Sequence, residues 1–184
     1  MGHPLYVYDH WLNYLNRFED KKIFELSYYF EGVRVPWFAK EWLEDYHEYN
    51  IYDKTLFSII YTYNILFENL LSQKNTRNVL VISFESIIFD TNNIMDKISK
   101  FASRKFTSSI KKTLKKQRIP RKTLSSGLGK TKYGFNEGSS DEEKDYKEKW
   151  NFIKLNCNTD LVNEFKTLIN KYNRFFPSKL KSYE

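Results

Sequence analysis

Residues 78–84 read NVLVISF, and this stretch decides the fold that the sequence predicts. Five of its seven residues are apolar, and three of those five are Val or Ile. A continuous apolar run without polar alternation is typical of a strand buried on both faces, as in a parallel sheet covered by helices. Ser83, Glu85 and Ser86 come where this strand would end, at the edge where α/β sheets bind ligands. We expect the Glu85 carboxylate to accept backbone N–H groups of the turn that follows.

The rest of the chain is expected to form helices and one short hairpin. The hairpin is predicted from the bulky residues at 23–30, the turn residue Gly32 and the residues at 33–38 that follow it. Pro36 lacks a backbone N–H, so this second arm cannot be a central strand of a sheet. An aromatic patch follows and is expected to be core or a lid on it; its members are Trp37, Phe38, Trp42, Tyr46 and Tyr49. Apolar spacing and capping residues predict helices over 9–18, 53–72, 91–101 and 159–172, and others that begin at Thr107 and Asp141.

The charge is concentrated in one segment. The chain has 184 residues, the size of one domain, and a net charge of +7. Between Lys97 and Lys132 there are 13 Lys or Arg and no acid, so the remainder has 17 basic and 23 acidic residues. We therefore expect an anionic ligand to bind at 97–132.

The only cysteine is Cys157, which excludes an internal disulfide. No run reaches the length of a membrane span, and a cytoplasmic protein is expected.

The motifs point to anion binding rather than to metal chemistry. Gly127 and its neighbouring glycines lie in a long basic loop, 118–140, and let a backbone approach a phosphate closely. A solvated basic loop explains the same residues equally well. No Walker-type phosphate loop is present, and His3, His10 and His47 lack metal-ligand spacing, so no metal is expected. Ser83 lacks the glycines of a nucleophile elbow.

Several segments together resemble the sulfotransferase family in order and spacing. Residues 3–11 are similar to its 3′-phosphate-binding segment, 79–85 to a later strand and 94–101 to the helix after it. Residues 118–122 with Gly127 and 133–135 resemble the C-terminal loop that closes over the nucleotide. The likeness extends from His3 to about Tyr172.

The resemblance implies an α/β, P-loop-like sulfotransferase fold, mostly helical with a small parallel-sheet remnant. It implies a single domain over 1–177 with a tail at 178–184. The implied activity is sulfuryl transfer from 3′-phosphoadenosine 5′-phosphosulfate (PAPS) to a hydroxyl or amine acceptor. PAPS or its product adenosine 3′,5′-bisphosphate would then be held by His10, Arg121, Lys122 and Gly127, and the catalytic base stays unassigned.

Two departures from the family pattern reduce the expected activity. Gly2 stands where the family has an Arg, and His10 stands where it has a Ser. The family's phosphosulfate loop would precede Met1, so the chain is expected to be a C-terminal portion with little or no turnover. Low turnover is expected because transfer reactions of this kind depend on the positioning and electrostatic stabilisation of the transferred group.

Two other functions stay open. The segment 97–132 is a candidate binding surface for nucleic acid or another anionic partner. Aromatic residues fall mostly outside that segment, which argues against nucleic acid because single-strand binders interleave rings with basic residues. Alternatively, an aromatic surface left by the missing strands pairs with a separately encoded protein partner.

Overall fold

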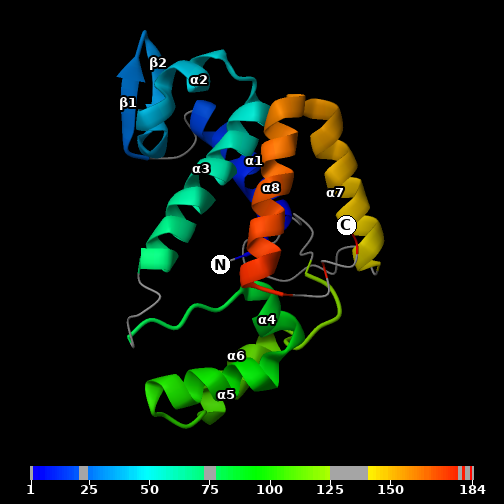
Figure 1. Cartoon of the computed structure of the whole chain (residues 1–184). Coiled ribbons are helices and arrows are strands. Elements are labelled where there is room, and N and C mark those ends of the chain that lie inside the picture. Colours follow the sequence, from blue (N-terminus) through cyan, green and yellow to red (C-terminus); the bar gives the residue numbers. More distant parts are fainter. Residues whose placement is uncertain are drawn as a thin grey trace. The chain divides into compact units, whose positions relative to one another are not determined.

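The computed structural model describes residues 2–20, 25–72, 78–124 and 141–177, together with residues 180 and 183. These residues are mostly helical (Figure 1). The elements are α1 (Pro4–Glu19), β1 (Ser27–Phe30), β2 (Val33–Pro36), the 3-10 helix η1 (Trp37–Trp42), α2 (Leu43–Glu48), α3 (Ile51–Ser72), α4 (Phe84–Phe89), α5 (Thr91–Ala102), α6 (Ser108–Lys116), α7 (Glu142–Asn156) and α8 (Thr159–Phe175). None of the helices that these residues form has both the length and the apolar character that a membrane span requires.

The chain divides into two compact units of opposite charge. The first, here called the basic unit, comprises Met1–Tyr6, Thr76–Lys149 and Tyr172–Glu184. The second, the aromatic unit, comprises Val7–Asn75 and Trp150–Lys171. By sequence the basic unit has 20 Lys or Arg and 10 Asp or Glu, a net charge of +10, whereas the aromatic unit has 10 and 13, a net charge of −3. The unequal charge seen in the sequence therefore follows the division of the fold.

The predicted buried strand at 78–84 is wrong. Residues 79–83 have no regular structure, and the Val79 and Val81 side chains are 45% and 38% exposed. Residues 84–89 form α4 instead, because the Ser83 hydroxyl accepts a hydrogen bond from the Ser86 backbone N–H at 3.1 Å and caps the helix. An apolar run makes a buried strand only where neighbouring strands pair with it, and in the described ranges none does.

The sheet of the described residues is a two-stranded antiparallel hairpin, so the predicted parallel remnant is also wrong. A P-loop-like α/β fold has no support from these residues. The hairpin at 27–36 is confirmed: Ser27 pairs with Pro36 and Phe30 with Val33. Its two-residue turn has positive φ at Glu31 (49°) and Gly32 (80°), as the strand twist of a tight hairpin requires. Pro36 ends the strand at its edge, where a missing N–H is tolerated.

Arg34 fastens the hairpin to α1 within the aromatic unit. Its guanidinium lies 4.1 Å from the centre of the Phe18 ring, and Nη1 donates to the Phe18 carbonyl at 3.3 Å. Nε donates to the Ser27 hydroxyl at 3.2 Å. The core beside these contacts is a cluster of Leu15, Val35, Ala39, Trp42 and Tyr46. The expectation that the aromatic patch is core is thus confirmed for Trp42 and Tyr46, whereas Trp37 is 54% exposed.

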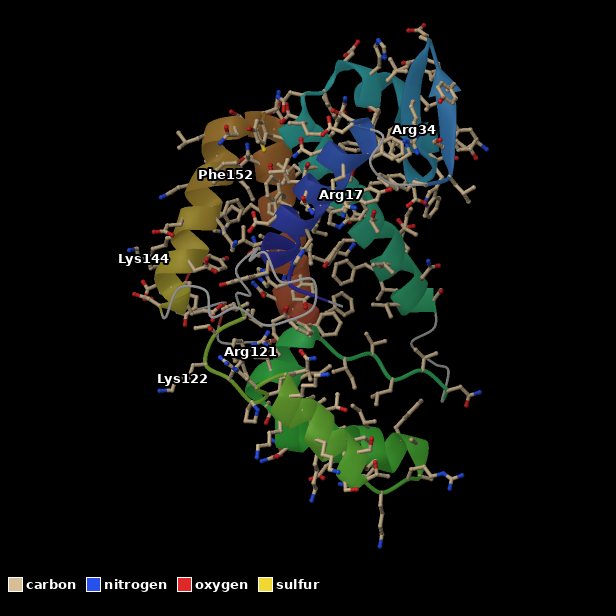
Figure 2. The ribbon with its side chains drawn as sticks, turned by 180° about the vertical axis from the view of Figure 1, so that it is seen from behind. Arg17, Arg34, Arg121, Lys122, Lys144 and Phe152 are labelled. Atoms are coloured by element: carbon tan, nitrogen blue, oxygen red, sulfur yellow. The ribbon has the colours of Figure 1, made fainter. Side chains whose placement is uncertain are left out.

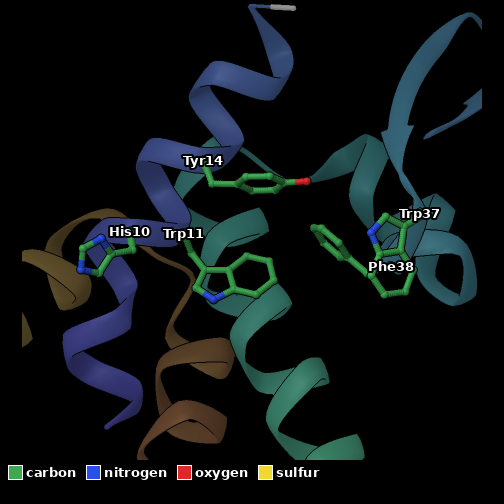
Figure 3. Close-up of a pocket in the computed structure, with 5 residues that line it drawn as sticks. All are labelled: His10, Trp11, Tyr14, Trp37 and Phe38. Carbon is green, nitrogen blue, oxygen red and sulfur yellow. The ribbon is translucent and has the colours of Figure 1, made fainter. Parts of the chain in front are cut away.

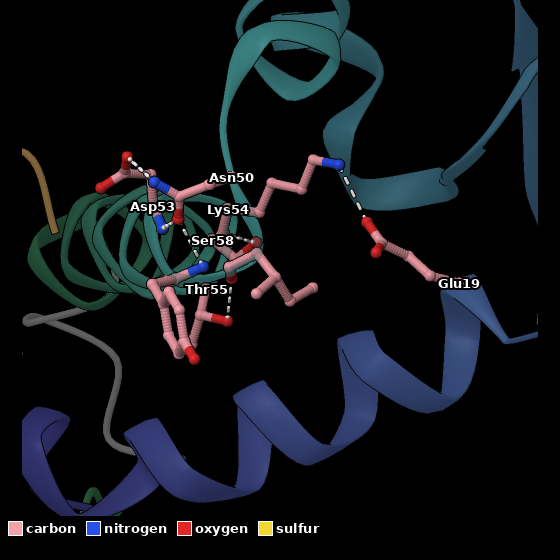
Figure 4. Close-up of polar contacts among 8 residues, drawn as sticks. Glu19, Asn50, Asp53, Lys54, Thr55 and Ser58 are labelled. Carbon is pink, nitrogen blue, oxygen red and sulfur yellow. Dashed lines mark hydrogen bonds and ion pairs between the residues drawn. The ribbon is translucent and has the colours of Figure 1, made fainter. Parts of the chain in front are cut away.

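The first turn of α3 holds a buried carboxylate, Asp53, whose contact with Asn50 is drawn in Figure 4. A second contact of Asp53 joins this helix start to that of α8. Helix α3 begins at Ile51, two residues before the predicted start at 53, and Asn50 caps it: the Asn50 Oδ1 accepts from the N–H groups of Tyr52 (2.8 Å) and Asp53 (3.0 Å). Asp53 Oδ1 accepts from the Asn158 N–H at 2.7 Å, just before α8, and Oδ2 accepts from Asn50 Nδ2 at 2.7 Å. Lys54 forms an ion pair with Glu19 at 2.8 Å.

We expect Asp53→Ala to lower the free energy of unfolding by about 2 kcal/mol, because it leaves the Asn158 N–H without its carboxylate acceptor. Urea unfolding followed by far-UV circular dichroism measures this change. Asp160→Ala removes an exposed carboxylate from the first turn of α8 and should cost below about 1 kcal/mol. Equal losses in the two variants would contradict the joining role of Asp53.

Candidate anion-binding site

Eight exposed cations of the basic unit lie on α5, α6 and the residues between them, here called the basic helix pair (91–116). α5 uses Ile94 as its buried contact and packs on α4. It ends at Ser103, whose φ of 50° turns the chain, and the N–H groups of Ser103 and Arg104 donate to carbonyls of the last turn at 3.2 and 3.0 Å. Thr107 then caps α6 as predicted, its hydroxyl accepting from the Ile110 N–H at 3.4 Å. The turn therefore places the cations of 104–105 between two helices.

The helix pair carries a dense array of exposed charge. α6 has no buried residue, and its apolar side is reduced to the 39% exposed Ile110 and the half-buried Leu114. Figure 2 shows nitrogen-tipped side chains around both helices. The exposed cations are Lys97, Lys100, Arg104, Lys105, Lys111, Lys112, Lys115 and Lys116. Within the described part of the chain none of these eight forms an ion pair, so their charge is available to a partner.

A pocket of about 410 Å³ opens where α5 ends. The described residues of its lining provide three cations, two hydroxyls, one ring and one carboxylate, from Asp96, Ser99, Lys100, Ser103, Arg104, Lys105 and Phe106. The lining has a net charge of +2, and the hydroxyls add hydrogen-bond donors. Cations and hydroxyls suit a phosphate group, and an aromatic ring beside them suits a stacked base. Asp96 and the negative end of the α5 dipole oppose an anion, but the three cations outweigh them.

Arg121, predicted to bind a nucleotide, is engaged by the protein itself. Its Nε donates to the Thr123 carbonyl at 3.0 Å, Nη1 to the Gln117 carbonyl at 3.3 Å and Nη2 to the Leu124 carbonyl at 3.4 Å. Its backbone N–H donates to the Ile88 carbonyl at 3.3 Å. Burial lowers the pKa of the guanidinium. These contacts fix the chain after α6 and use three of the five N–H donors of the guanidinium.

The other predicted nucleotide-binding residues are dispersed. Lys122 is exposed and points outward in Figure 2. His10 is exposed on α1 and belongs to the aromatic unit, whereas Arg121 and Lys122 belong to the basic unit. Gly127 lies outside the described residues. Nucleotide binding by these four residues stays a prediction.

A buried polar cluster of the basic unit was missed by the sequence analysis. The Glu85 carboxylate accepts from the His3 backbone N–H and, at 2.6 Å, from the Tyr172 hydroxyl. We expected Glu85 to accept N–H groups of the turn that follows it, but the backbone donor is His3, 82 positions away in sequence. The His3 ring is fully buried, with its centre 5.2 Å from that of Tyr172, and its Nδ1 accepts from the Leu5 N–H at 3.3 Å. This contact caps α1, which begins at Pro4 rather than at the predicted Asp9.

Burial controls the ionisation of this cluster. It lowers the pKa of His3 to about 3, so the imidazole is neutral at neutral pH, and its Nε2 has no hydrogen-bond partner among the described residues. Burial raises the pKa of Glu85, while the hydrogen bonds from Tyr172 and His3 lower it. In the described ranges no group of three or more His, Cys, Asp or Glu side chains is placed to hold a metal ion.

Comparison with protein-family models, with curated proteins and with solved structures gives no match to this chain.

Proposed function

We propose that this chain is a non-catalytic binding module that holds single-stranded nucleic acid on the basic helix pair. The observation that carries the proposal is the pocket at the end of α5, where Lys100, Arg104 and Lys105 surround a cavity that Phe106 also lines. Cations hold the phosphate backbone of any sequence, and an aromatic ring adds stacking energy for an unpaired base. Both components of single-strand binding therefore occur in one pocket.

The positions of two phenylalanine rings favour binding of single-stranded over double-stranded nucleic acid. Phe101 on α5 is 47% exposed, and Phe106 is half-buried in the pocket lining. Both rings fall inside the basic segment, which weakens the sequence argument that aromatics and cations are segregated. Bases in a duplex are stacked on one another and do not offer their faces to a side chain, whereas those of a single strand do.

We expect Phe106→Leu to weaken binding of a single-stranded oligonucleotide about tenfold and to leave duplex binding unchanged, because stacking contributes about 1–3 kcal/mol per base. Arg104→Ala should weaken binding of both forms and reduce the slope of log K against log salt by about 0.7 for the single strand. Fluorescence anisotropy with a labelled strand of about twelve nucleotides measures both effects.

The matched control is Arg17→Ala, which removes an exposed cation from the last turn of α1. It should leave the affinity for the oligonucleotide unchanged. Circular dichroism of each variant separates loss of binding from loss of fold. Wild-type affinity in both Arg104→Ala and Phe106→Leu, or equal weakening in Arg17→Ala, would contradict the assignment of the pocket.

Sulfuryl transfer from PAPS stays a prediction that rests on the sequence resemblance alone. Its distinguishing test is calorimetric titration with adenosine 3′,5′-bisphosphate. Saturable binding that Arg121→Ala abolishes, with the variant still folded, would favour the sulfotransferase hypothesis over nucleic-acid binding. Turnover with any acceptor would show that the chain is a catalyst and not only a binding module.

A further inference from the structure

The aromatic unit contains a second pocket, of about 360 Å³, that is lined almost entirely by aromatic rings (Figure 3). α1 contributes His10, Trp11 and Tyr14, and η1 contributes Trp37 and Phe38. In the close-up the rings of Trp11, Tyr14 and Phe38 surround a common space, whereas His10 lies apart on the other side of Trp11. Among the residues that the structure describes, the lining includes no Lys or Arg.

Three ring pairs of the pocket cross at close to a right angle, whereas Tyr14 and Phe38 are tilted by 42° with centres 6.2 Å apart. The planes of Trp11 and Phe38 cross at 84° with ring centres 5.1 Å apart, and those of Trp11 and Tyr14 cross at 77° at 5.9 Å. Trp37 and Phe38 cross at 82° at 5.9 Å. A flat base stacks best between parallel faces, whereas a compact, rounded cation contacts several crossed faces at once. The ring geometry therefore favours a rounded ligand.

The surroundings favour a positive charge. The aromatic unit has a net charge of −3. The Glu25 carboxylate lies near the Tyr14 hydroxyl: burial and then Glu25 raise the pKa of Tyr14, against a smaller opposite effect of Arg34. Ring faces of this unit already accept cations, since the Arg34 guanidinium lies 4.1 Å from the centre of the Phe18 ring. Aromatic faces attract cations through the ring quadrupole, and quaternary ammonium ions, which have no N–H to leave unsatisfied, suit such pockets best.

We propose that this pocket binds the trimethylammonium group of a small molecule of the choline class. The exposed Trp37 indole forms the outer wall, and Trp11, Tyr14 and Phe38 form the inner walls. This ligand site is independent of the nucleic-acid function, because the two pockets belong to different units and share no residue.

The test is calorimetric titration of the full chain with choline and with 3,3-dimethyl-1-butanol, which has the same shape without the charge. We expect choline to bind at least about tenfold more tightly than the neutral analogue. Trp37→Ala should weaken choline binding about tenfold without affecting the fold, because this side chain is 54% exposed. Trp11→Phe keeps a ring at the inner wall and should cause a smaller loss.

Tyr29→Ala is the matched control, since Tyr29 is an aromatic residue of β1 that is 74% exposed and does not line the pocket. It should bind choline as the wild type does. Equal affinity for choline and the neutral analogue would overturn the proposal, as would absent choline binding or unchanged binding in both tryptophan variants. Adenosine binding in place of choline binding would overturn it as well and would identify a base-stacking site.

Discussion

Acidification from pH 6.5 to pH 4 is expected to remove about 3 kcal/mol of stability through His3 alone. Burial holds the pKa of His3 at about 3, against an ordinary value of 6.5. Between these two values the unfolded chain binds a proton that the folded chain does not. The stabilisation is therefore complete above pH 6.5 and is lost progressively as the pH falls toward 3. The whole shift corresponds to about 5 kcal/mol, which is comparable with the total stability of many domains.

The variant that isolates this effect is His3→Asn. Asn is a good N-cap residue, so it can still accept the Leu5 N–H at the start of α1, but it does not titrate in this range. The backbone N–H at position 3 still donates to Glu85. Urea unfolding at pH 7 and pH 4 should show that the variant loses about 3 kcal/mol less than the wild type. Parallel losses in the two proteins would contradict a buried, neutral His3.

The pH dependence of stability that Glu85 contributes has the opposite sign to that of His3, so it needs a variant of its own. Because burial raises its pKa above the ordinary 4.5, the folded state binds a proton more readily than the unfolded state does. Its contribution is therefore complete below pH 4.5 and is lost as the pH rises through the folded value. A comparison of the wild type with Glu85→Gln over pH 4 to 8 should show this trend, and the reverse trend would exclude the burial effect.

Replacement of Glu85 by Ala is expected to cost about 3–5 kcal/mol, a large fraction of the stability of a domain. The side chain is 1% exposed and accepts hydrogen bonds from the His3 N–H and the Tyr172 hydroxyl. Its removal leaves two buried donors without an acceptor, at about 1–3 kcal/mol each, and creates a cavity. Urea unfolding monitored by circular dichroism measures the loss.

Two variants calibrate this result. Tyr172→Phe removes one donor and keeps the ring, so it should cost less than Glu85→Ala. Glu148→Ala removes an exposed carboxylate of α7 that lies 3.8 Å from Lys144 and should change stability by less than about 1 kcal/mol. A loss in Glu85→Ala no larger than that in Glu148→Ala would show that the cluster does not hold the basic unit together.

Local patterns predicted much of the helical fold. The spacing of apolar residues in 53–72 predicted α3 to within its first turn, and Thr107 correctly marked the start of α6. The hairpin was predictable because Gly32 and its flanking bulky residues are contiguous. These signals depend on neighbours in sequence, and such neighbours are visible without a structure.

The predictions that were wrong or missing concern contacts between residues that lie far apart in the sequence. Residues 78–84 have strand composition, but no partner pairs with them in the described ranges, and Ser83 instead begins a helix. The Glu85 contacts join residues 82 and 87 positions apart, which no spacing rule identifies. Pro4 at the first helical position is a usable signal for the start of α1, whereas the prediction placed that start at residue 9. The aromatic pocket combines α1 with η1; Trp37 and Phe38 were predicted to belong to an aromatic patch and His10 to bind a nucleotide, but no sequence signal joined the two segments.

The most direct measurement of function is the affinity for a single-stranded oligonucleotide across a salt series, with adenosine 3′,5′-bisphosphate as competitor. With three phosphate contacts at the pocket of α5, we expect log K to fall with log salt at a slope of about −2 or steeper. The bisphosphate should not displace the strand at micromolar concentration. Binding that is insensitive to salt, or displacement by the bisphosphate that Arg121→Ala abolishes, would contradict nucleic-acid binding by the basic helix pair.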